Sequence, residues 1–331
     1  MLDRNRAPRS IDGTRFRIPQ VLAALAVALL WGCGPGPKVV PHEGRYAIYA
    51  LHLATQDVRL LYSRANEIQT SALRLDASGG TLLFAQKVDG DSNENFELCT
   101  VATDGSAFRR LTANSVWDLY PAWSSDNTRI AFLSLRRNDL DIYVMNADGT
   151  GDTLLHDSGS HDGDIDWVGN SIVFTSGFRI WKMNDDGTQA RQVTSPANAG
   201  QWGRANLPIG DYDPKLSPDG TKIVFERLED PSTSHGRYNL FVADSNGAGE
   251  VRLTNSGYAQ GLPTWAHSGS MLAYTVAAIE EQGAYDVYLI DADGTDNHNA
   301  TPDYFPADLL CHATAFAKGD SELYFIGQWW E

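Results

Sequence analysis

The stretch from Asp213 to Glu226 reads DPKLSPDGTKIVFE, and it is the part of the chain that most clearly indicates the fold. Its SPDG segment (217–220) has the residue preferences of a type I turn, because Pro fixes φ at the second position and Gly suits the fourth. Ile223 and Phe225 follow two residues apart, which places both side chains on one face of a β-strand. The stretch therefore predicts a strand, a tight turn and a second strand.

The same pattern recurs along the chain. Apolar residues two apart, the second of them aromatic, recur as Leu82/Phe84, Ile130/Phe132, Ile172/Phe174, Ile223/Phe225, Leu272/Tyr274 and Leu323/Phe325. After all but the last pair comes a second hairpin, whose turn is Asp104-Gly105, Asp148-Gly149, Asp186-Gly187, Asn246-Gly247 or Asp293-Gly294. Asp-Gly and Asn-Gly pairs favour tight hairpins because the turn needs positive φ. Each complete unit is expected to contain four antiparallel strands.

Two incomplete units lie at the ends of the repeat. Residues 45–63 supply only a second hairpin, and residues 309–328 supply only a first hairpin. Paired side by side, they would complete one more unit and close the ring, which removes the open edge between the first and last sheets. The sequence therefore predicts an all-β fold: a six-bladed β-propeller of four-stranded antiparallel blades, closed by N-terminal and C-terminal half-blades.

The N-terminus has the pattern of an export signal. An Arg-rich stretch (4–17) precedes an apolar stretch (21–31) that would form a helix of only about 17 Å, too short for a bilayer core of about 30 Å. We expect residues 1–32 to be a cleaved signal peptide. The segment ending Leu30-Trp31-Gly32-Cys33 resembles a bacterial lipoprotein signal, which implies lipidation of Cys33; the alternative is ordinary secretion with an incidental cysteine.

The mature chain is strongly acidic. Residues 33–331 carry 21 Lys and Arg against 40 Asp and Glu, a net charge of −19. This charge repels nucleic acid and anionic lipid surfaces, so neither is an expected direct partner. We expect a monomer whose only membrane contact is a lipid anchor. Cys99 and Cys311 are expected to be free buried thiols, although an oxidising compartment leaves a bridge between them open.

Residues 120–150 and 213–226, with the later strand 239–248, resemble the TolB-type propeller repeat. The resemblance covers about residues 43–328, and it is specific for fold and weak for function. It implies a propeller over residues 43–331, with residues 33–42 as a tether. TolB has an α/β domain ahead of its propeller; about ten residues separate Cys33 from the first expected strand, so that domain is not expected here. The resemblance to a lipoprotein signal also has an implication for location: in such signals an Asp after the cysteine favours the inner membrane, so Gly34 implies an outer-membrane lipoprotein on the periplasmic or cell-surface side.

One position of the repeat is a candidate channel rim. Counted five residues back from the Trp or Leu before each turn, it holds Thr70, Asp118, Asp162, Asp211, Gln260 and Cys311, and His161 adjoins Asp162. Acids gathered at a channel mouth would hold a cation, with Ca²⁺ as one candidate, or a basic partner segment. The alternative is that these acids open the strands as turn residues or pair with basic neighbours.

Two loops exceed the repeat, over residues 195–212 and 227–237. Long loops on a rigid scaffold often carry specificity, so Trp202, Arg204 and His235 are candidate binding residues. The alternative is that these loops carry no function. Trp329 and Trp330 are expected to pack where the ring closes.

Catalytic signatures are sparse in this sequence. It contains neither G-x-S-x-G nor H-E-x-x-H, and no Cys/His zinc pattern. We therefore expect no catalytic residues, no metal site and no cofactor, and we predict a non-enzymatic cell-envelope binding or scaffolding module that presents a propeller face to a protein or glycan. The alternatives are a lyase or hydrolase that acts on carbohydrate or peptide at the channel mouth, and a structural envelope lipoprotein.

Overall fold

The computed structural model describes residues 38–88, 95–202, 208–230, 237–278 and 284–330. All regular elements in these ranges are β-strands. No helix among the described residues is long and apolar enough to cross a membrane. The signal segment and Cys33 lie outside the described residues.

Four of the sheets are four-stranded and antiparallel, and each takes its strands from one continuous stretch of chain. The first sheet contains β3 (Ile68–Leu75), β4 (Thr81–Lys87), β5 (Phe96–Ala102) and β6 (Arg109–Arg110). The second contains β7 (Asp118–Trp123), β8 (Arg129–Ser134), β9 (Asp141–Asn146) and β10 (Thr153–His156). The third contains β11 (Asp162–Val168), β12 (Ser171–Ser176), β13 (Arg179–Asn184) and β14 (Arg191–Gln192). The fourth contains β15 (Gly210–Leu216), β16 (Lys222–Asp230), β17 (Arg237–Asp244) and β18 (Val251–Arg252).

The fifth sheet has eight strands and joins the two ends of the chain. It contains β19 (Ala259–Trp265), β20 (Met271–Ala278), β21 (Ala284–Asp291), β22 (His298–Asn299), β23 (Leu309–Phe316), β24 (Glu322–Trp329), β1 (Tyr46–His52) and β2 (Val58–Arg64). The antiparallel ladder between β1 and β24 runs from Tyr46 opposite Gln328 to His52 opposite Glu322. A single parallel pair, Tyr285 with Leu310, links β21 to β23. The expected pairing of the chain ends is therefore present, but it lies within one large sheet, so the described strands form five sheets and not six.

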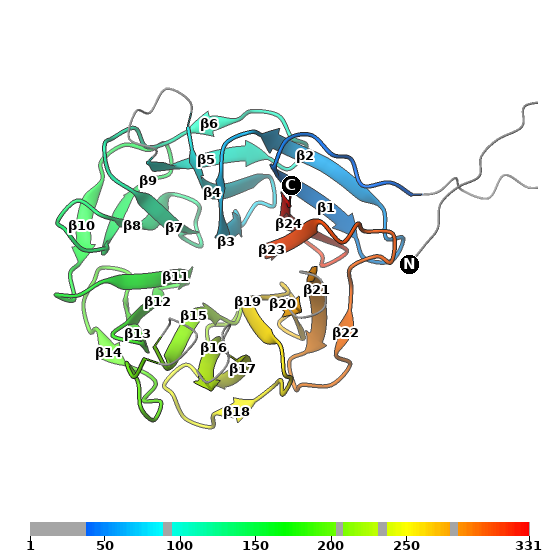
Figure 1. Cartoon of the computed structure of the whole chain (residues 1–331). Coiled ribbons are helices and arrows are strands. Elements are labelled where there is room, and N and C mark those ends of the chain that lie inside the picture. Colours follow the sequence, from blue (N-terminus) through cyan, green and yellow to red (C-terminus); the bar gives the residue numbers. More distant parts are fainter. Residues whose placement is uncertain (1–37, 89–94, 203–207, 231–236, 279–283, 331) are drawn as a thin grey trace, which may run out of the picture. The chain divides into compact units, whose positions relative to one another are not determined.

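The sheets of residues 38–330 follow one another around a ring, which confirms an all-β propeller (Figure 1). The strands β3, β7, β11, β15, β19 and β23 lie nearest the centre (Figure 1). The register shifts in the middle of each of these inner strands. Four residues at these bulges have positive φ: Tyr120, Asp164, Asp213 and Leu262. The bulges bend the inner strands, as irregular pairing of this kind does.

The aromatic column of the repeat forms the core. Its members Phe84, Phe132, Phe174, Phe225, Tyr274 and Phe325 are all at most 1% exposed. Burying a side chain of this size contributes roughly 1.5–3 kcal/mol. The period that predicts the strands therefore also predicts residues of the buried core.

Turn glycines mark a second contact between neighbouring sheets. Gly105 and Gly247 have φ of +86° and +90°, a region that favours glycine. A Cβ at Gly105 would lie 2.3 Å from the carbonyl oxygen of Leu61, and one at Gly247 would lie 2.2 Å from that of Val193. The Asp-Gly and Asn-Gly turns thus pack directly on the backbone of the preceding sheet.

Residues 38–42, expected to be tether, lie against the closure of the ring. Val40 is 6% exposed, and the carbonyl oxygen of Pro41 accepts a hydrogen bond from the Tyr49 hydroxyl at 2.8 Å. His42 stacks on Trp329 with ring centroids 3.8 Å apart. Trp329 is buried there, as predicted. Trp330 is 66% exposed, so the expectation that it also packs is wrong: it follows the last residue of β24, where the ladder has ended.

Candidate functional site

The residues predicted for the channel rim lie at or near the beginning of the inner strands, but they are buried. Asp118 and Asp211 are 0% exposed, and Asp162 is 2% exposed. Gln260 and Cys311 are buried as well, and Thr70 is half-buried. The repeat position therefore places these residues at equivalent points of the sheets, beneath the loops that join one sheet to the next.

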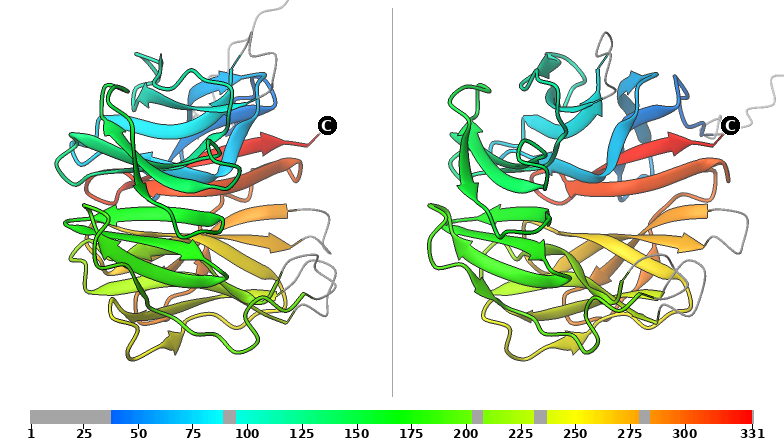
Figure 2. Two further views of the ribbon diagram at one scale, coloured as in Figure 1. Left: turned by 90° about the vertical axis from the view of Figure 1, so that its left-hand side faces the viewer. Right: turned by 60° about the vertical axis from the view of Figure 1, so that its left-hand side comes forward.

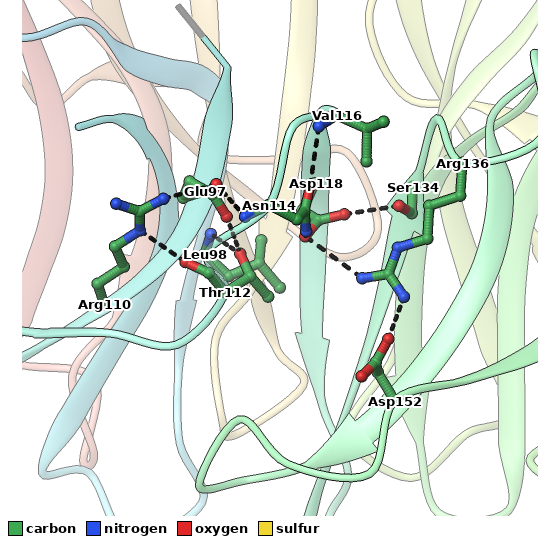
Figure 3. A network of polar contacts seen from close by, with 10 residues as sticks. All are labelled: Glu97, Leu98, Arg110, Thr112, Asn114, Val116, Asp118, Ser134, Arg136 and Asp152. Carbon is green, nitrogen blue, oxygen red and sulfur yellow. Dashed lines mark hydrogen bonds and ion pairs between the residues drawn. The ribbon is translucent and has the colours of Figure 1, made fainter. Parts of the chain in front are cut away.

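Asp118 is held by its own sheet and by the connection that precedes it (Figure 3). Its carboxylate accepts hydrogen bonds from Ser134 Oγ at 2.6 Å and from Asn114 Nδ2 at 2.7 Å. Arg136 Nη2 lies 3.7 Å from Asp118 Oδ2, and Arg136 also pairs with Asp152. Burial raises the pKa of Asp118, and these partners oppose the shift. The partners leave this acid fully engaged within the protein.

Asn114 extends the network to the first sheet (Figure 3). Its backbone N–H donates to Glu97 Oε1 at 2.9 Å. Glu97 is 0% exposed and also accepts from Thr112 Oγ1 at 2.5 Å and from Arg110 Nη2 at 2.8 Å. A buried carboxylate is stable only when its oxygens are bonded in this way. The network therefore fixes the connection between the first and second sheets.

Asp211 shows the same behaviour in the fourth sheet. Arg227 donates to both of its oxygens, from Nε at 2.5 Å and from Nη2 at 3.0 Å. Arg227 also donates to Glu250, which completes a surface-facing ion pair. Burial raises the pKa of Asp211, and Arg227 opposes the shift. A bidentate pair of this kind is among the stronger polar contacts in proteins.

Asp162 is the least satisfied of the three acids. Its Oδ1 accepts from Ser158 Oγ at 2.6 Å, whereas its buried Oδ2 has no hydrogen-bond partner among the described residues. Burial raises its pKa to about 6. The neighbouring His161 uses Nδ1 to accept a hydrogen bond from the Leu140 N–H at 2.9 Å. The Oε1 of Gln260 is also buried without a described partner.

Exposed tryptophans gather at one end of the ring. Trp202 is 66% exposed, and Trp117 is 44% exposed. Trp117 directly precedes the inner strand β7, and Trp202 lies in the connection that leads into the inner strand β15. Trp330 follows β24, and the end of β24 pairs with the beginning of the inner strand β23. All three therefore lie at the end where the inner strands begin, called here the tryptophan end. Arg204 and His235 lie outside the described residues.

A charged cluster at the inner strands was missed by sequence reasoning. In the fourth sheet, Lys215 forms an ion pair with Asp213, and both side chains are almost fully buried. In the third sheet, Asp164 Oδ2 accepts from the Asp213 N–H at 3.2 Å and from Thr175 Oγ1 at 3.1 Å. Burial raises the pKa of Asp164 to about 6, and the charge of Asp213 adds to the effect. Residues of neighbouring sheets thus meet at the centre of the ring.

Two further acids belong to this cluster. Asp166 accepts from the Leu216 N–H at 2.9 Å, and its Oδ1 lies 3.8 Å from Arg74 Nε. Glu226 accepts from the Leu262 N–H at 3.1 Å, and burial raises its pKa well above the ordinary value. Asp164, Asp166, Asp213 and Glu226 face two bases, Arg74 and Lys215, so the cluster carries an excess of acid.

A signal for the cluster exists in the sequence. In the strand segment DGDIDW (162–167), Asp164 and Asp166 lie three residues and one residue before the buried Trp167. In DYDPKL (211–216), Asp213 and Lys215 have the same spacing from the buried Leu216. These positions alternate with the core column, so their side chains point away from it.

No group of three or more His, Cys, Asp or Glu side chains among the described residues is placed to hold a metal ion. Cys99 and Cys311 are free and buried, as predicted. The described geometry is that of buried acids bonded inside and between sheets, together with aromatic side chains exposed at one end.

Three sequence relatives are found, and no family model matches. The chain is 27% identical over 177 residues to an uncharacterized protein of Agrobacterium fabrum, covering 50% of this chain and 57% of that protein. It is 28% identical over 220 residues to a TolB homolog of Chlorobium luteolum, covering 62% of this chain and 46% of the relative. It is 28% identical over 112 residues to the Tol-Pal system protein TolB of Desulfosudis oleivorans, covering 32% of this chain and 26% of the relative. The chain thus spans about half the length, or less, of these curated relatives.

Solved structures share the fold. A provisionally named TolB from Agrobacterium tumefaciens superposes with a TM-score of 0.68 at 16% identity, over 88% of this chain and 100% of that chain. TolB from Acinetobacter baumannii gives a TM-score of 0.56 at 16% identity, over 78% and 66%. An oligogalacturonate lyase in complex with manganese gives 0.53 at 14% identity, over 86% and 82%. At these identities the likeness shows the fold alone; with the relatives named TolB, it supports a TolB-like β-propeller.

Proposed function

We propose that this TolB-like β-propeller is a non-enzymatic binding module of the cell envelope, which presents its tryptophan end to a protein partner. The sequence relatives named TolB support a protein-binding role, one of them as a Tol-Pal system protein. Asp118 and Asp211 are bonded by partners inside the molecule, so their first role is to position the connections between sheets. Binding is then carried by what these connections expose.

The exposed tryptophans are the observation that carries this proposal. Trp117 and Trp202 lie on connections into different sheets, yet both are at the same end of the ring. Exposed tryptophan is uncommon on a soluble surface and is enriched in the residues that dominate binding energy at protein interfaces. The opposite end carries tight turns such as SPDG (217–220) beside a cavity of about 620 Å³, but no exposed tryptophan among the described residues. A glycan partner could stack on the same rings, so it remains the alternative ligand for this end.

The ring is best interpreted as six blades. The eight-stranded sheet contains two sets of four strands, β19 to β22 and β23, β24, β1 and β2. Only the pair Tyr285–Leu310 connects the sets. The second set takes one hairpin from each end of the chain, which is the closure expected from the repeat.

We further propose that the protein is exported and anchored by a lipid on Cys33, after removal of residues 1–32. The support is the basic and apolar pattern of the N-terminus and the residues Leu30 and Gly32 before the cysteine. A periplasmic location agrees with this pattern and with the relatives named TolB, and the outer membrane is proposed because the residue after Cys33 is not Asp. Replacement of Cys33 by Ser should release the protein from membranes in cell fractionation; continued membrane association of the variant would refute the anchor.

Binding at the tryptophan end is tested by affinity capture from envelope extracts. The doubly substituted Trp117→Ala, Trp202→Ala protein is expected to lose the partner that the unaltered protein captures. Phe108→Ala provides the matched control, because Phe108 is 37% exposed and lies beside the Asp104-Gly105 turn at the opposite end. Equal capture by all three proteins would contradict the proposal.

An enzyme is the second candidate, because solved lyases share the fold. Two oligogalacturonate lyases superpose on this chain, one of them in complex with manganese. Incubation with oligogalacturonate, with and without Mn²⁺, should give no unsaturated product detectable by ultraviolet absorbance. Product formation that depends on Mn²⁺ would favour the enzyme and overturn the binding role.

A further inference from the structure

A polar residue recurs just before the buried apolar residue of the third strand in most sheets. In the first sheet it is Glu97, which accepts from Thr112 and from the Asn114 N–H. In the fourth sheet it is Asn239, whose Oδ1 accepts from the Ser256 N–H at 3.2 Å. In the eight-stranded sheet it is Asp286, which accepts from Asn299 Nδ2 at 3.2 Å. The side chain at this position therefore normally accepts hydrogen bonds from the segment that leads to the next strand or sheet.

Asp141 occupies the same position in the second sheet and is different. It is 0% exposed, and neither of its carboxylate oxygens has a hydrogen-bond partner among the described residues. In the other sheets a threonine hydroxyl lies beside this position and accepts a hydrogen bond from the backbone N–H of the next residue, which is buried. The pairs are Thr112 with Leu98, Thr194 with Ile180, Thr254 with Leu240 and Thr301 with Val287. In the second sheet β10 has shifted register and ends at His156, so no threonine reaches Asp141. Asp141 therefore lacks the hydrogen-bonding neighbour that the other sheets supply at this position.

The orphaned carboxylate lies beside a second one from the next sheet. The N–H of Asp162 donates to the carbonyl oxygen of Leu140 at 2.8 Å, which brings the first residue of β11 next to the beginning of β9. The Oδ2 of Asp162 is buried and also lacks a described hydrogen-bond partner. At this junction between the two sheets, both oxygens of Asp141 thus lack a described hydrogen-bond partner, and Asp162 beside it is bonded only by the hydroxyls of Ser158 and Ser176.

Hydroxyl groups connect this junction to a cavity. Ser158 donates to Asp162 Oδ1, and Ser176 Oγ lies 3.1 Å from Ser158 Oγ. These serines, with Ser160 and Trp181, line a surface cavity of about 410 Å³. The junction therefore combines carboxylate oxygens with hydroxyl groups, and the serines beside Asp162 border the cavity.

The surrounding charges do not neutralise the two acids. Asp139 and Asp157 add negative charge near Asp141, while Arg137 and His161 act in the opposite direction. Arg137 is half exposed, and its Nη2 lies 3.4 Å from Asp157, so part of its charge is already compensated. Burial raises the pKa of Asp141 and of Asp162. Two buried carboxylates in such surroundings require a proton or a cation.

We propose that Asp141 and Asp162 form a binding site for a hard divalent cation of the Ca²⁺ type at the junction of the second and third sheets. All available donors are oxygens, which is the ligand set that Ca²⁺ prefers, and its flexible geometry accepts serine hydroxyls and water at the remaining positions. Only two carboxylates contribute, so the affinity expected is that of weak extracellular sites, with a Kd of roughly 10⁻⁴–10⁻³ M. The site ties two sheets together and does not depend on the partner proposed above.

Terbium luminescence tests the site directly, because Trp181 at the cavity can sensitise bound Tb³⁺. The full-length protein is titrated with Tb³⁺ and then with Ca²⁺ or Mg²⁺ as competitors. We expect Ca²⁺ to displace Tb³⁺ and to raise the melting temperature of the protein. Asp141→Asn and Asp162→Asn should each weaken the apparent Ca²⁺ affinity at least tenfold and abolish the Ca²⁺-dependent rise. Asp286→Asn is the matched control, at the same repeat position with its bonding partners present, and should change the affinity less than twofold.

Folding of the key variant can be expected, because the fourth sheet carries Asn239 at the position of Asp141. Circular dichroism of Asp141→Asn checks this independently of Ca²⁺. Absence of Ca²⁺ binding at 10 mM, or equal Ca²⁺ affinity in the unaltered protein and Asp141→Asn, would overturn the site. Asp141→Asn could also be more stable than the unaltered protein by the same amount with and without Ca²⁺. That result would show that the two carboxylates share a proton, and it would overturn the cation site as well.

Discussion

Arg74 on β3 donates a hydrogen bond from Nη2 to the carbonyl oxygen of Ile165 on β11, at 3.1 Å. The first and third sheets are joined by this bond although the second sheet lies between them in the order of the ring (Figure 1). The same guanidinium lies 3.8 Å from Asp166 Oδ1. Figure 2 shows the ring from the side, where the first, second and third sheets follow one another. Arg74 therefore acts as a polar bridge across the centre of the propeller.

Replacement of Arg74 by Met should test this bridge. Met keeps much of the apolar stem but leaves Asp166 without its cation, and breaking a buried pair in this way costs about 3 kcal/mol. The free energy of unfolding in urea should fall by this amount. Arg109→Met, at an exposed position of β6, should change stability by less than about 0.5 kcal/mol. Equal losses in the two variants would show that the bridge contributes nothing.

The turn glycines make a second, steric prediction. Gly105→Ala and Gly220→Ala both place a side chain at positive φ, but only the first has backbone in the way: its Cβ would lie 2.3 Å from Leu61 O, whereas nothing lies within 4 Å of a Cβ at Gly220. Gly220→Ala should cost about 1 kcal/mol from φ strain alone. Gly105→Ala should cost at least twice as much, measured by chemical denaturation. Similar losses would mean that the sheets adjust freely at this contact.

Local patterns were enough to predict the strands and the closure of the ring. The aromatic column ending at Phe225 and the Asp-Gly turns are short-range signals, because strand alternation and turn geometry depend on neighbouring residues. The two complementary half-units predicted that the chain ends pair, and the structure adds the register, with Tyr46 opposite Gln328. The parallel pair Tyr285–Leu310, which merges two sets of strands into one sheet, depends on how closely two sheets approach, and no local pattern encodes this.

The candidate site was predicted less well, for a physical reason. Sequence reasoning found polar residues at equivalent repeat positions but could not tell which would be exposed. Asp118 and Asp211 are buried because side chains such as Arg227, from a neighbouring strand, cover them. The bond from Arg74 to Ile165 joins residues 91 positions apart and has no counterpart in the repeat. Contacts of this kind depend on the three-dimensional arrangement of the sheets.

Asp164 predicts a pH dependence of stability. Its folded pKa is raised from 3.8 to about 6 by burial and by Asp213. The folded protein therefore binds this proton more tightly than the unfolded chain, so the group favours folding at low pH and this contribution is lost as the pH rises from about 4 through 6. Asp164→Asn cannot titrate. The stability of the unaltered protein relative to the variant should fall by up to about 3 kcal/mol between pH 4 and pH 7.

Urea denaturation of both proteins at several pH values measures this difference. Distant titrating groups, such as His312 with its lowered pKa, affect both proteins equally and cancel in the comparison, whereas Glu226, whose pKa is raised by burial and also by the charge of Asp164, adds to the difference. Asp186→Asn is a suitable control, because the pKa of this turn residue is lowered and its effect should appear only below pH 4. A constant difference between the unaltered protein and Asp164→Asn across pH 4–7 would contradict the raised pKa.

The segment before the first strand gives the last prediction. Val39 and Val40 are neighbours of the same kind, yet Val39 is 76% exposed and Val40 is 6% exposed. At about 0.8 kcal/mol per buried methylene, Val40→Ala should lower the free energy of unfolding by about 1.5 kcal/mol, and Val39→Ala should leave it unchanged. Equal values for the two variants would mean that residues 38–42 do not hold to the propeller in solution. A loss confined to Val40→Ala would show that residues 38–42 are docked on the propeller.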